Sequence, residues 1–132
     1  MTPWNLLEID KALRVSWAAE TCSPDDVAGW RPDNPAWGHC DITALIVHDL
    51  FGGDLVVGEV HRDGVQHGFH WWNRLSSGAE LDLTREQFRQ GQSIRAARVV
   101  ERPPGPLPRR WAEYLLLRER VRKHLGVLPE PM

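Results

Sequence analysis

The sequence predicts an α+β fold, with helices toward both ends of the chain and an antiparallel sheet between them. Two observations carry this prediction. Apolar residues recur at helical spacing near both ends, and short β-rich runs separated by turn residues fill the middle. The chain has 132 residues, enough for one domain with its own hydrophobic core. We therefore expect a single domain over residues 1–132.

The N-terminal part is predicted to hold two helices. Thr2 and Pro3 form a capping residue followed by a first-turn proline, and apolar residues recur at helical spacing over 4–20. A second Ser-Pro cap signal predicts a short helix over 25–29. Residues 31–38 contain two prolines and a glycine, which predicts a loop.

The next helix is expected over residues 40–50 and begins at a cysteine. It has an apolar stripe, and Gly52-Gly53 ends it. Cys40 therefore lies at a helix start, directly after the loop.

Three strands are predicted to follow, over residues 55–61, 65–75 and 79–83, as an antiparallel β-meander. Asp63-Gly64 between the first two is the strongest two-residue hairpin signal in the chain.

The last third is predicted to alternate short elements and end in a helix. Thr84 begins a capping-box pattern, which indicates a short helix ending near Gly91. Residues 94–100 are interpreted as a strand. Residues 102–108 hold four prolines and a glycine and form a stiff connector to a C-terminal helix over 110–125.

A candidate catalytic triad follows from this order of elements. Cys40 at a helix start would be the nucleophile, His70 on the second strand its base, and Asp82 on the third strand the group that orients the base. If residues 76–78 form a three-residue loop, strand alternation places His70, Trp72 and Asp82 on one face, with the imidazole and carboxylate as diagonal neighbours. A register shift of one residue would separate them.

The surroundings of Cys40 suit a nucleophile. Helix N-termini favour the thiolate, and the Cys40 amide is a candidate oxyanion donor. Asn34 is a candidate for the second donor, and Gly38 lets substrate approach the backbone closely. Trp37 and Trp72 are expected to line the cleft.

Each of these residues also has a structural interpretation. A cysteine on an apolar helix is more often a packing residue, and a strand histidine needs no catalytic role. A metal site is the rival constellation, because His39, His61 and His67 lie near Cys40 or His70 in sequence. Their spacing matches no established zinc motif, and the hairpin register separates His61 from His67. We therefore expect no metal and no cofactor.

Charge is distributed unevenly along the chain. Residues 1–84 carry five Lys/Arg and thirteen Asp/Glu, and residues 85–132 carry eleven Lys/Arg and five Asp/Glu. A basic C-terminal third could bind nucleic acid or an acidic protein, which makes a non-catalytic binding or regulatory module the alternative function. A nucleic-acid motif is missing from the sequence, so paired and solvated helix charges are the favoured interpretation.

The sequence shows neither a membrane-spanning apolar run nor a secretory signal pattern, which predicts a cytoplasmic protein with reduced thiols and no membrane partner. Cys22 is interpreted as a small buried residue. The predicted partner is a small-molecule or protein substrate, and the oligomeric state is left open.

Several short motifs follow one another in a fixed order along the chain. They are Asn34-Pro35-Ala36-Trp37-Gly38-His39-Cys40, Thr43-Ala44-Leu45, Phe51-Gly52-Gly53, His70-Trp71-Trp72-Asn73-Arg74-Leu75, Gly78, Asp82-Leu83-Thr84 and Gln87-Phe88. On these motifs the chain resembles the YunG-like family of small bacterial proteins over about residues 17–88. Gly-Gln-Cys is the commoner form of the cysteine motif in that family, so His39 is a departure from it.

More distantly, the segment from His70 to Thr84 is similar to the histidine and aspartate strands of transglutaminase-like and papain-like cysteine enzymes. That similarity implies the same roles for Cys40, His70 and Asp82 and a cysteine hydrolase or acyltransferase acting on an amide or acyl bond. It does not identify the substrate.

Overall fold

The computed structural model describes residues 5–85, 91–102, 105–106 and 109–126. Over these ranges the protein has the predicted α+β class, with three α-helices and one antiparallel sheet of four strands. The helices are α1 (Leu6–Ser16), α2 (Cys40–Phe51) and α3 (Trp111–Leu125), with short 3₁₀ turns η1 (Ala19–Thr21) and η2 (Val27–Gly29). The strands are β1 (Asp54–Arg62), β2 (Val65–Arg74), β3 (Glu80–Leu81) and β4 (Gln92–Val100).

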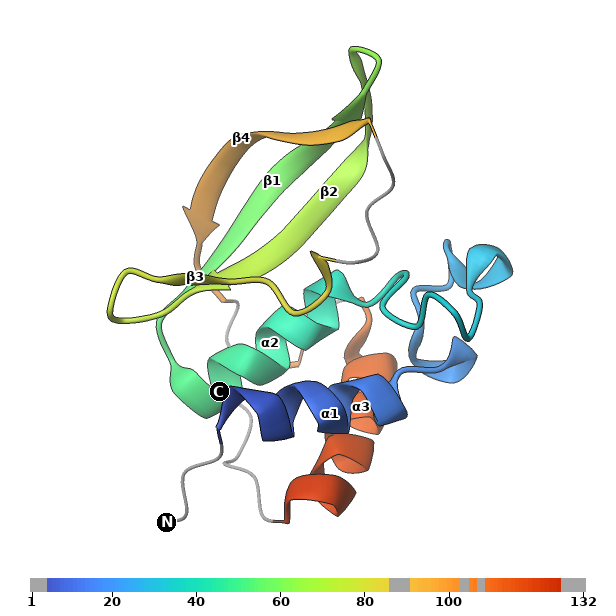
Figure 1. Ribbon diagram of the computed structural model, residues 1–132, viewed down its shortest axis with the longest axis vertical. Helices are drawn as coiled ribbons and strands as arrows, with labels where there is room; N and C mark the ends of the chain where they lie inside the picture. Colours follow the sequence, from blue (N-terminus) through green and yellow to red (C-terminus); the bar gives the residue numbers. More distant parts are fainter. Residues whose placement is uncertain (1–4, 86–90, 103–104, 107–108, 127–132) are drawn as a thin grey trace.

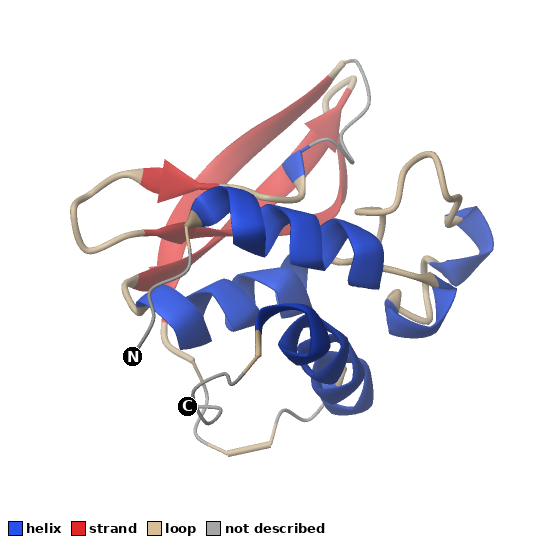
Figure 2. Cartoon of the chain, turned by 60° about the horizontal axis from the view of Figure 1, so that its bottom comes forward, coloured by secondary structure: helices blue, strands red, loops and turns tan. Residues whose placement is uncertain are grey.

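The helices cover one end of the sheet, and the hairpin of β1 and β2 extends away from them (Figure 1). Turning the molecule shows all three helices on the same side of the strands (Figure 2). Helix α2 is the central element, because it contacts β1 and β2 on one side and α3 on the other, while α1 packs on α3. The start of α2 therefore lies where the helices and the sheet meet.

The pairing of β2 with β3 has the predicted register. The hairpin of β1 and β2 has it only next to the turn, because a bulge between Glu59 and His61 shifts the pairing by one residue. The amide of Leu75 donates to the carbonyl of Ala79, as the three-residue loop requires. Asp63 and Gly64 both have positive φ, which matches the two-residue hairpin turn expected there. The strand order is β3-β2-β1-β4, so only the first three strands form a meander, and the last strand pairs with β1.

The boundaries of the first helices differ from the prediction. Helix α1 begins after an Asn5 cap that forms a capping box with Glu8; Thr2-Pro3 lies outside the described residues. The helix ends before Trp17, whose backbone is extended and whose indole donates to the buried Thr43 hydroxyl. Long-range burial of this indole thus outweighs the helical periodicity that continues to residue 20.

Other predicted elements are shorter or fall outside the described ranges. The second predicted helix is only the 3₁₀ turn Val27–Gly29, and the third strand is only Glu80–Leu81. Most of the helix expected after Thr84 lies outside the described residues, as does part of the 102–108 connector. The C-terminal helix begins at Trp111, because Arg110 has a positive φ of 69° and acts as its cap residue.

The hydrophobic core lies between the helices and the helix-facing side of β1. Helix α3 is attached to this core by apolar packing and by a buried hydrogen-bond network of Arg102, Asp49 and Tyr114. Arg102 donates to Asp49 at 2.6 Å and to the Tyr114 hydroxyl at 3.1 Å, and that hydroxyl donates to the second Asp49 oxygen. Burial and the neighbouring Asp49 carboxylate raise the pKa of Tyr114 to about 12. The core side chains are Ile9, Leu13, Ile42, Ile46, Leu55, Tyr114, Leu117 and Val121.

Replacing Arg102 should therefore destabilise the protein strongly. The Arg102→Ala change leaves the Asp49 carboxylate buried without its main counter-charge, which costs about 3 kcal/mol of unfolding free energy. Arg109→Ala is the matched control, because the Arg109–Asp25 pair is almost fully exposed and contributes less than about 1 kcal/mol. Urea unfolding followed by circular dichroism measures both values. Equal losses in the two variants would contradict a structural role for the buried pair.

Candidate active site

Cys40 and His70 line the same pocket, which lies between the start of α2 and the strand β2 and has a volume of about 210 Å³. Cys40 is half-buried and is the first residue of α2, where the helix dipole and first-turn amides favour a negative charge. Trp37 and Gly38 also line this pocket, as the sequence predicts. The remaining lining residues are Ser23, Asp26, Asp41, Val60, His67, Phe69, Trp71 and Gln92.

The predicted hydrogen bond between His70 and Asp82 is present. His70 Nε2 lies 2.6 Å from Asp82 Oδ2, and the imidazole is almost fully buried. A carboxylate only accepts hydrogen bonds, so Nε2 carries the proton and Nδ1 is the nitrogen with a basic lone pair. The other oxygen of Asp82 accepts from the amide and hydroxyl of Thr84, each at 3.3 Å. Both carboxylate oxygens are thus held in place.

Trp72 supports the imidazole rather than lining the pocket. Its ring stacks on His70 with 5.7 Å between centroids and 22° between planes. The indole of Trp72 packs against Gly58 on β1. A Cβ atom added at Gly58 would lie 3.0 Å from the indole and 2.5 Å from Ile94. Glycine at this position therefore leaves room for the indole beside His70.

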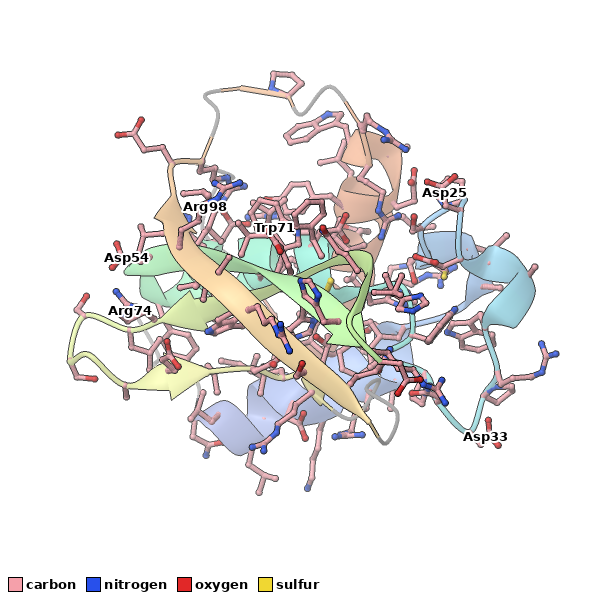
Figure 3. The ribbon with its side chains drawn as sticks, turned by 90° about the horizontal axis from the view of Figure 1, so that it is seen from above. Asp25, Asp33, Asp54, Trp71, Arg74 and Arg98 are labelled. Atoms are coloured by element: carbon pink, nitrogen blue, oxygen red, sulfur yellow. The ribbon has the colours of Figure 1, made fainter. Side chains whose placement is uncertain are left out.

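Asn34 lies outside the pocket lining as far as the described residues show. It belongs to a tight turn in which its amide donates to Arg31 and its carbonyl accepts from Trp37. Its neighbour Asp33 lies at the outer end of this loop (Figure 3). The prediction of Asn34 as the second oxyanion donor therefore receives no support from the pocket lining.

A side-chain hydrogen bond connects β2, which bears His70, to α2, which bears Cys40. The buried Asn73 amide on β2 donates to the carbonyl of Ala44 on α2 at 2.9 Å. Asn73 is three residues from His70, and Ala44 is four residues from Cys40. This contact therefore limits how far the strand can slide along the helix.

Cys22 differs from Cys40 in environment, although both are reduced thiols. Burial and the negative charge of Asp26 raise the pKa of the Cys22 thiol to about 11. Its sulfur lies against Gly38, where an added Cβ would approach it to 2.4 Å. Cys22 is thus a buried residue, as expected, and it shapes the turn that precedes Cys40.

His39 is fully buried and neutral. Nδ1 lies 2.8 Å from the Trp37 carbonyl, to which it can only donate, so Nε2 accepts from the Thr21 hydroxyl at 2.7 Å. Burial of the ring lowers the pKa of His39 to about 4. The contact with Thr21 attaches the loop before Cys40 to η1, and the contact with Trp37 closes a turn within that loop. A glutamine amide has the donor and the acceptor that both contacts require.

Arg110 is a site residue that sequence reasoning missed. Its guanidinium donates to both oxygens of Asp41, to the Gly38 carbonyl at 3.0 Å and to the Thr21 carbonyl at 3.3 Å. Burial acts to lower the pKa of Arg110, but Asp41 and Glu113 outweigh it and hold the pKa above its usual value. Arg110 therefore connects α3 to the residues on both sides of Cys40. No local motif could indicate a contact across about seventy positions.

The alternative sites receive less support from the geometry. Within the described ranges, no group of three or more His, Cys, Asp or Glu side chains is placed to hold a metal ion, and His61 bonds Glu59 instead. On the basic face of α3, Arg120 pairs with Glu20 and Arg122 with Glu119, while Arg118 approaches Asp49. Among the helices that are described, none is long and apolar enough to span a membrane.

These features define an α+β protein with a candidate Cys-His-Asp site at the start of its central helix. The family model described as YunG protein matches residues 5–126, so the chain belongs to the YunG family. It is 28% identical over 121 residues to the uncharacterized protein YunG of Bacillus subtilis (strain 168), which covers 89% of this chain and 92% of that protein. The match therefore extends well beyond residues 17–88, where the motifs were recognised. No solved structure matches the chain significantly.

The close approach at Gly38 leads to a stability prediction. Gly38→Ala should lower the unfolding free energy by about 2–4 kcal/mol, because the side chain meets Cys22 and φ is +75°. Gly64→Ala is the control, since its φ of +76° is the same but nothing lies within 4 Å, and it should cost about 1–2 kcal/mol. Chemical denaturation measures both. A loss at Gly38 no larger than that at Gly64 would show that the turn can move away from Cys22.

The burial of His39 predicts a pH dependence. Between about pH 6.5 and pH 4 the unfolded chain binds a proton that the folded His39 excludes, so stability is lost as the pH falls through this window. The unfolding free energy lost through protonation of His39 is on the order of 3 kcal/mol. His39→Gln should lack this pH-dependent loss, whereas His124→Gln, at an exposed position, should show the same loss as the wild type. Unfolding curves at pH 7 and pH 4 provide the comparison, and an unchanged pH dependence in His39→Gln would argue against this assignment.

Proposed function

We propose that the protein is a cysteine hydrolase or acyltransferase that acts on an amide or related acyl bond, with Cys40 as nucleophile, His70 as base and Asp82 as the residue that orients the base. The observation that carries the proposal is the His70–Asp82 hydrogen bond in the same structure that brings His70 and Cys40 to one pocket. Transglutaminase-like enzymes, to which the segment from His70 to Thr84 bears a distant similarity, use a cysteine, a histidine and an aspartate, and papain-like enzymes have an asparagine in place of the aspartate.

The chemistry would proceed by acyl transfer through sulfur. His70 Nδ1 takes the proton of the Cys40 thiol, and the sulfur attacks the carbonyl carbon of the substrate. The tetrahedral intermediate collapses to a thioester, and the protonated His70 gives its proton to the leaving amine. Water or a second amine then attacks the thioester, losing a proton to His70, and the proton returns to the sulfur as the product leaves.

Other residues of the pocket would assist these steps. The amide of Cys40 belongs to the first turn of α2, where amides are not used by the helix ladder, and it is suited to hold the oxyanion. Asp82, fixed by Thr84, keeps the proton on Nε2 of His70 and stabilises the imidazolium that forms. The stacked ring of Trp72 fixes the orientation of the His70 imidazole.

An activated ester can test the nucleophile without knowledge of the substrate. With p-nitrophenyl acetate, the wild-type protein should form a thioester at Cys40, detected by peptide mass spectrometry, and Cys40→Ala should not. Asp82→Ala should slow acylation by roughly 10²–10⁴-fold, because the base loses its tautomer and orientation.

Glu80→Ala is the control for the Asp82 variant. Glu80 lies on β3, two residues before Asp82, is exposed, and pairs only loosely with Arg74 at 3.7 Å, so acylation should be unchanged. Circular dichroism establishes that each variant is folded. Acylation of folded Asp82→Ala at the wild-type rate would rule out the proposed role of the carboxylate.

A further inference from the structure

A second cavity adjoins the Cys40 pocket, and we infer that it holds the apolar acyl chain of the substrate. This inference rests on the proposed function and adds the class of substrate. The cavity, called the apolar groove below, has a volume of about 460 Å³, within the range of small-molecule sites. It is lined by Ser23, Asp25, Asp41, Ile42, Leu45, Leu55, Phe69, Trp71, Glu101, Arg109 and Arg110.

The groove adjoins the pocket that Cys40 lines. Ser23, Asp41, Phe69 and Trp71 line both cavities, so the two share a border. During acyl transfer the acyl group is attached to the Cys40 sulfur in the thioester, and only the leaving group departs. A cavity next to the sulfur can therefore hold the acyl chain through both halves of the reaction.

The inner surface of the groove is built from core side chains. Ile42, Leu45 and Leu55 are nearly fully buried members of the hydrophobic core, and Trp71 packs partly against them. Figure 3 shows Trp71 near the middle of the molecule on the side toward α3. Phe69, in contrast, is 58% exposed at the junction of the two cavities. An apolar chain in this position would cover aromatic surface that is otherwise open to water.

The charges at the rim favour a neutral chain. Asp41 is paired with Arg110, and Asp25, at the outer edge of its loop (Figure 3), is paired with Arg109. These two pairs largely neutralise each other, and the third carboxylate of the lining, Glu101, is exposed, so the rim disfavours an anionic group. The groove therefore fits an alkanoyl or arylalkanoyl group of medium length, joined to the leaving group by an amide or a similar acyl bond.

The test uses esters that differ only in the acyl chain. The acylation rate of Cys40 by p-nitrophenyl acetate, butyrate and hexanoate is measured and divided by the rate of each ester with N-acetylcysteine. This ratio should rise by about two- to fourfold for each added methylene, as expected for burial of a CH₂ group. A flat ratio with detectable acylation would overturn the groove while leaving the proposed function standing.

Two variants on β2 provide a matched comparison. Phe69→Ala should lower the hexanoate-to-acetate ratio at least threefold. Val65→Ala should not change it, because Val65 is equally exposed at 58% on the same strand but lines neither cavity. An equal effect of both substitutions would exclude Phe69 as part of the acyl site.

A binding measurement separates failure of the groove from failure of the chemistry. Unreactive acetamide, butyramide and hexanamide are tested for protection of Cys40 against iodoacetamide, with the modified peptide quantified by mass spectrometry. Protection that strengthens with chain length supports the groove even if no ester acylates Cys40, an outcome that would count only against the proposed function. Absence of both protection and chain-length dependence would reject the groove.

Discussion

Helix α2 is held at both ends by arginines from the C-terminal part of the chain, and the candidate site depends on this restraint. Arg110 binds Asp41 at the first turn, and Arg102 binds Asp49 in the last turns. Both guanidinium groups are nearly buried, so each interacts in a medium of low polarity, where loss of one partner is costly. Cys40 is therefore positioned by residues more than sixty positions away from it along the chain.

The other half of the site is positioned by the sheet. The three-residue loop after β2 sets the register, the register brings His70 and Asp82 together, and Thr84 holds the second carboxylate oxygen. Asn73 then attaches this strand to α2 through the Ala44 carbonyl. The local and the long-range restraints thus meet at one pocket.

Much of the fold follows from patterns within short segments. Helical periodicity, the Asp63-Gly64 turn and the glycines after α2 are properties of neighbouring residues, and they place Cys40 at a helix start and His70 on a strand. The prediction was wrong where distant packing intervenes. The helix after Asn5 ends early because Trp17 turns toward Thr43. The sequence left the partner of the last strand open, and the structure pairs β4 with β1.

By itself, the sequence determined the α+β class, the Asp63-Gly64 turn and the pairing of His70 with Asp82, because each depends on spacing along short stretches of chain. Only the tertiary structure decided where the bulge in β1 lies, that Trp72 stacks on His70, and that Arg110 holds the loop before Cys40. The apolar groove also depends on the tertiary structure, because its walls come from β1, β2, α2 and the C-terminal segment together. Burial, and the pairing of charges across it, exist only once segments far apart in the chain pack against each other.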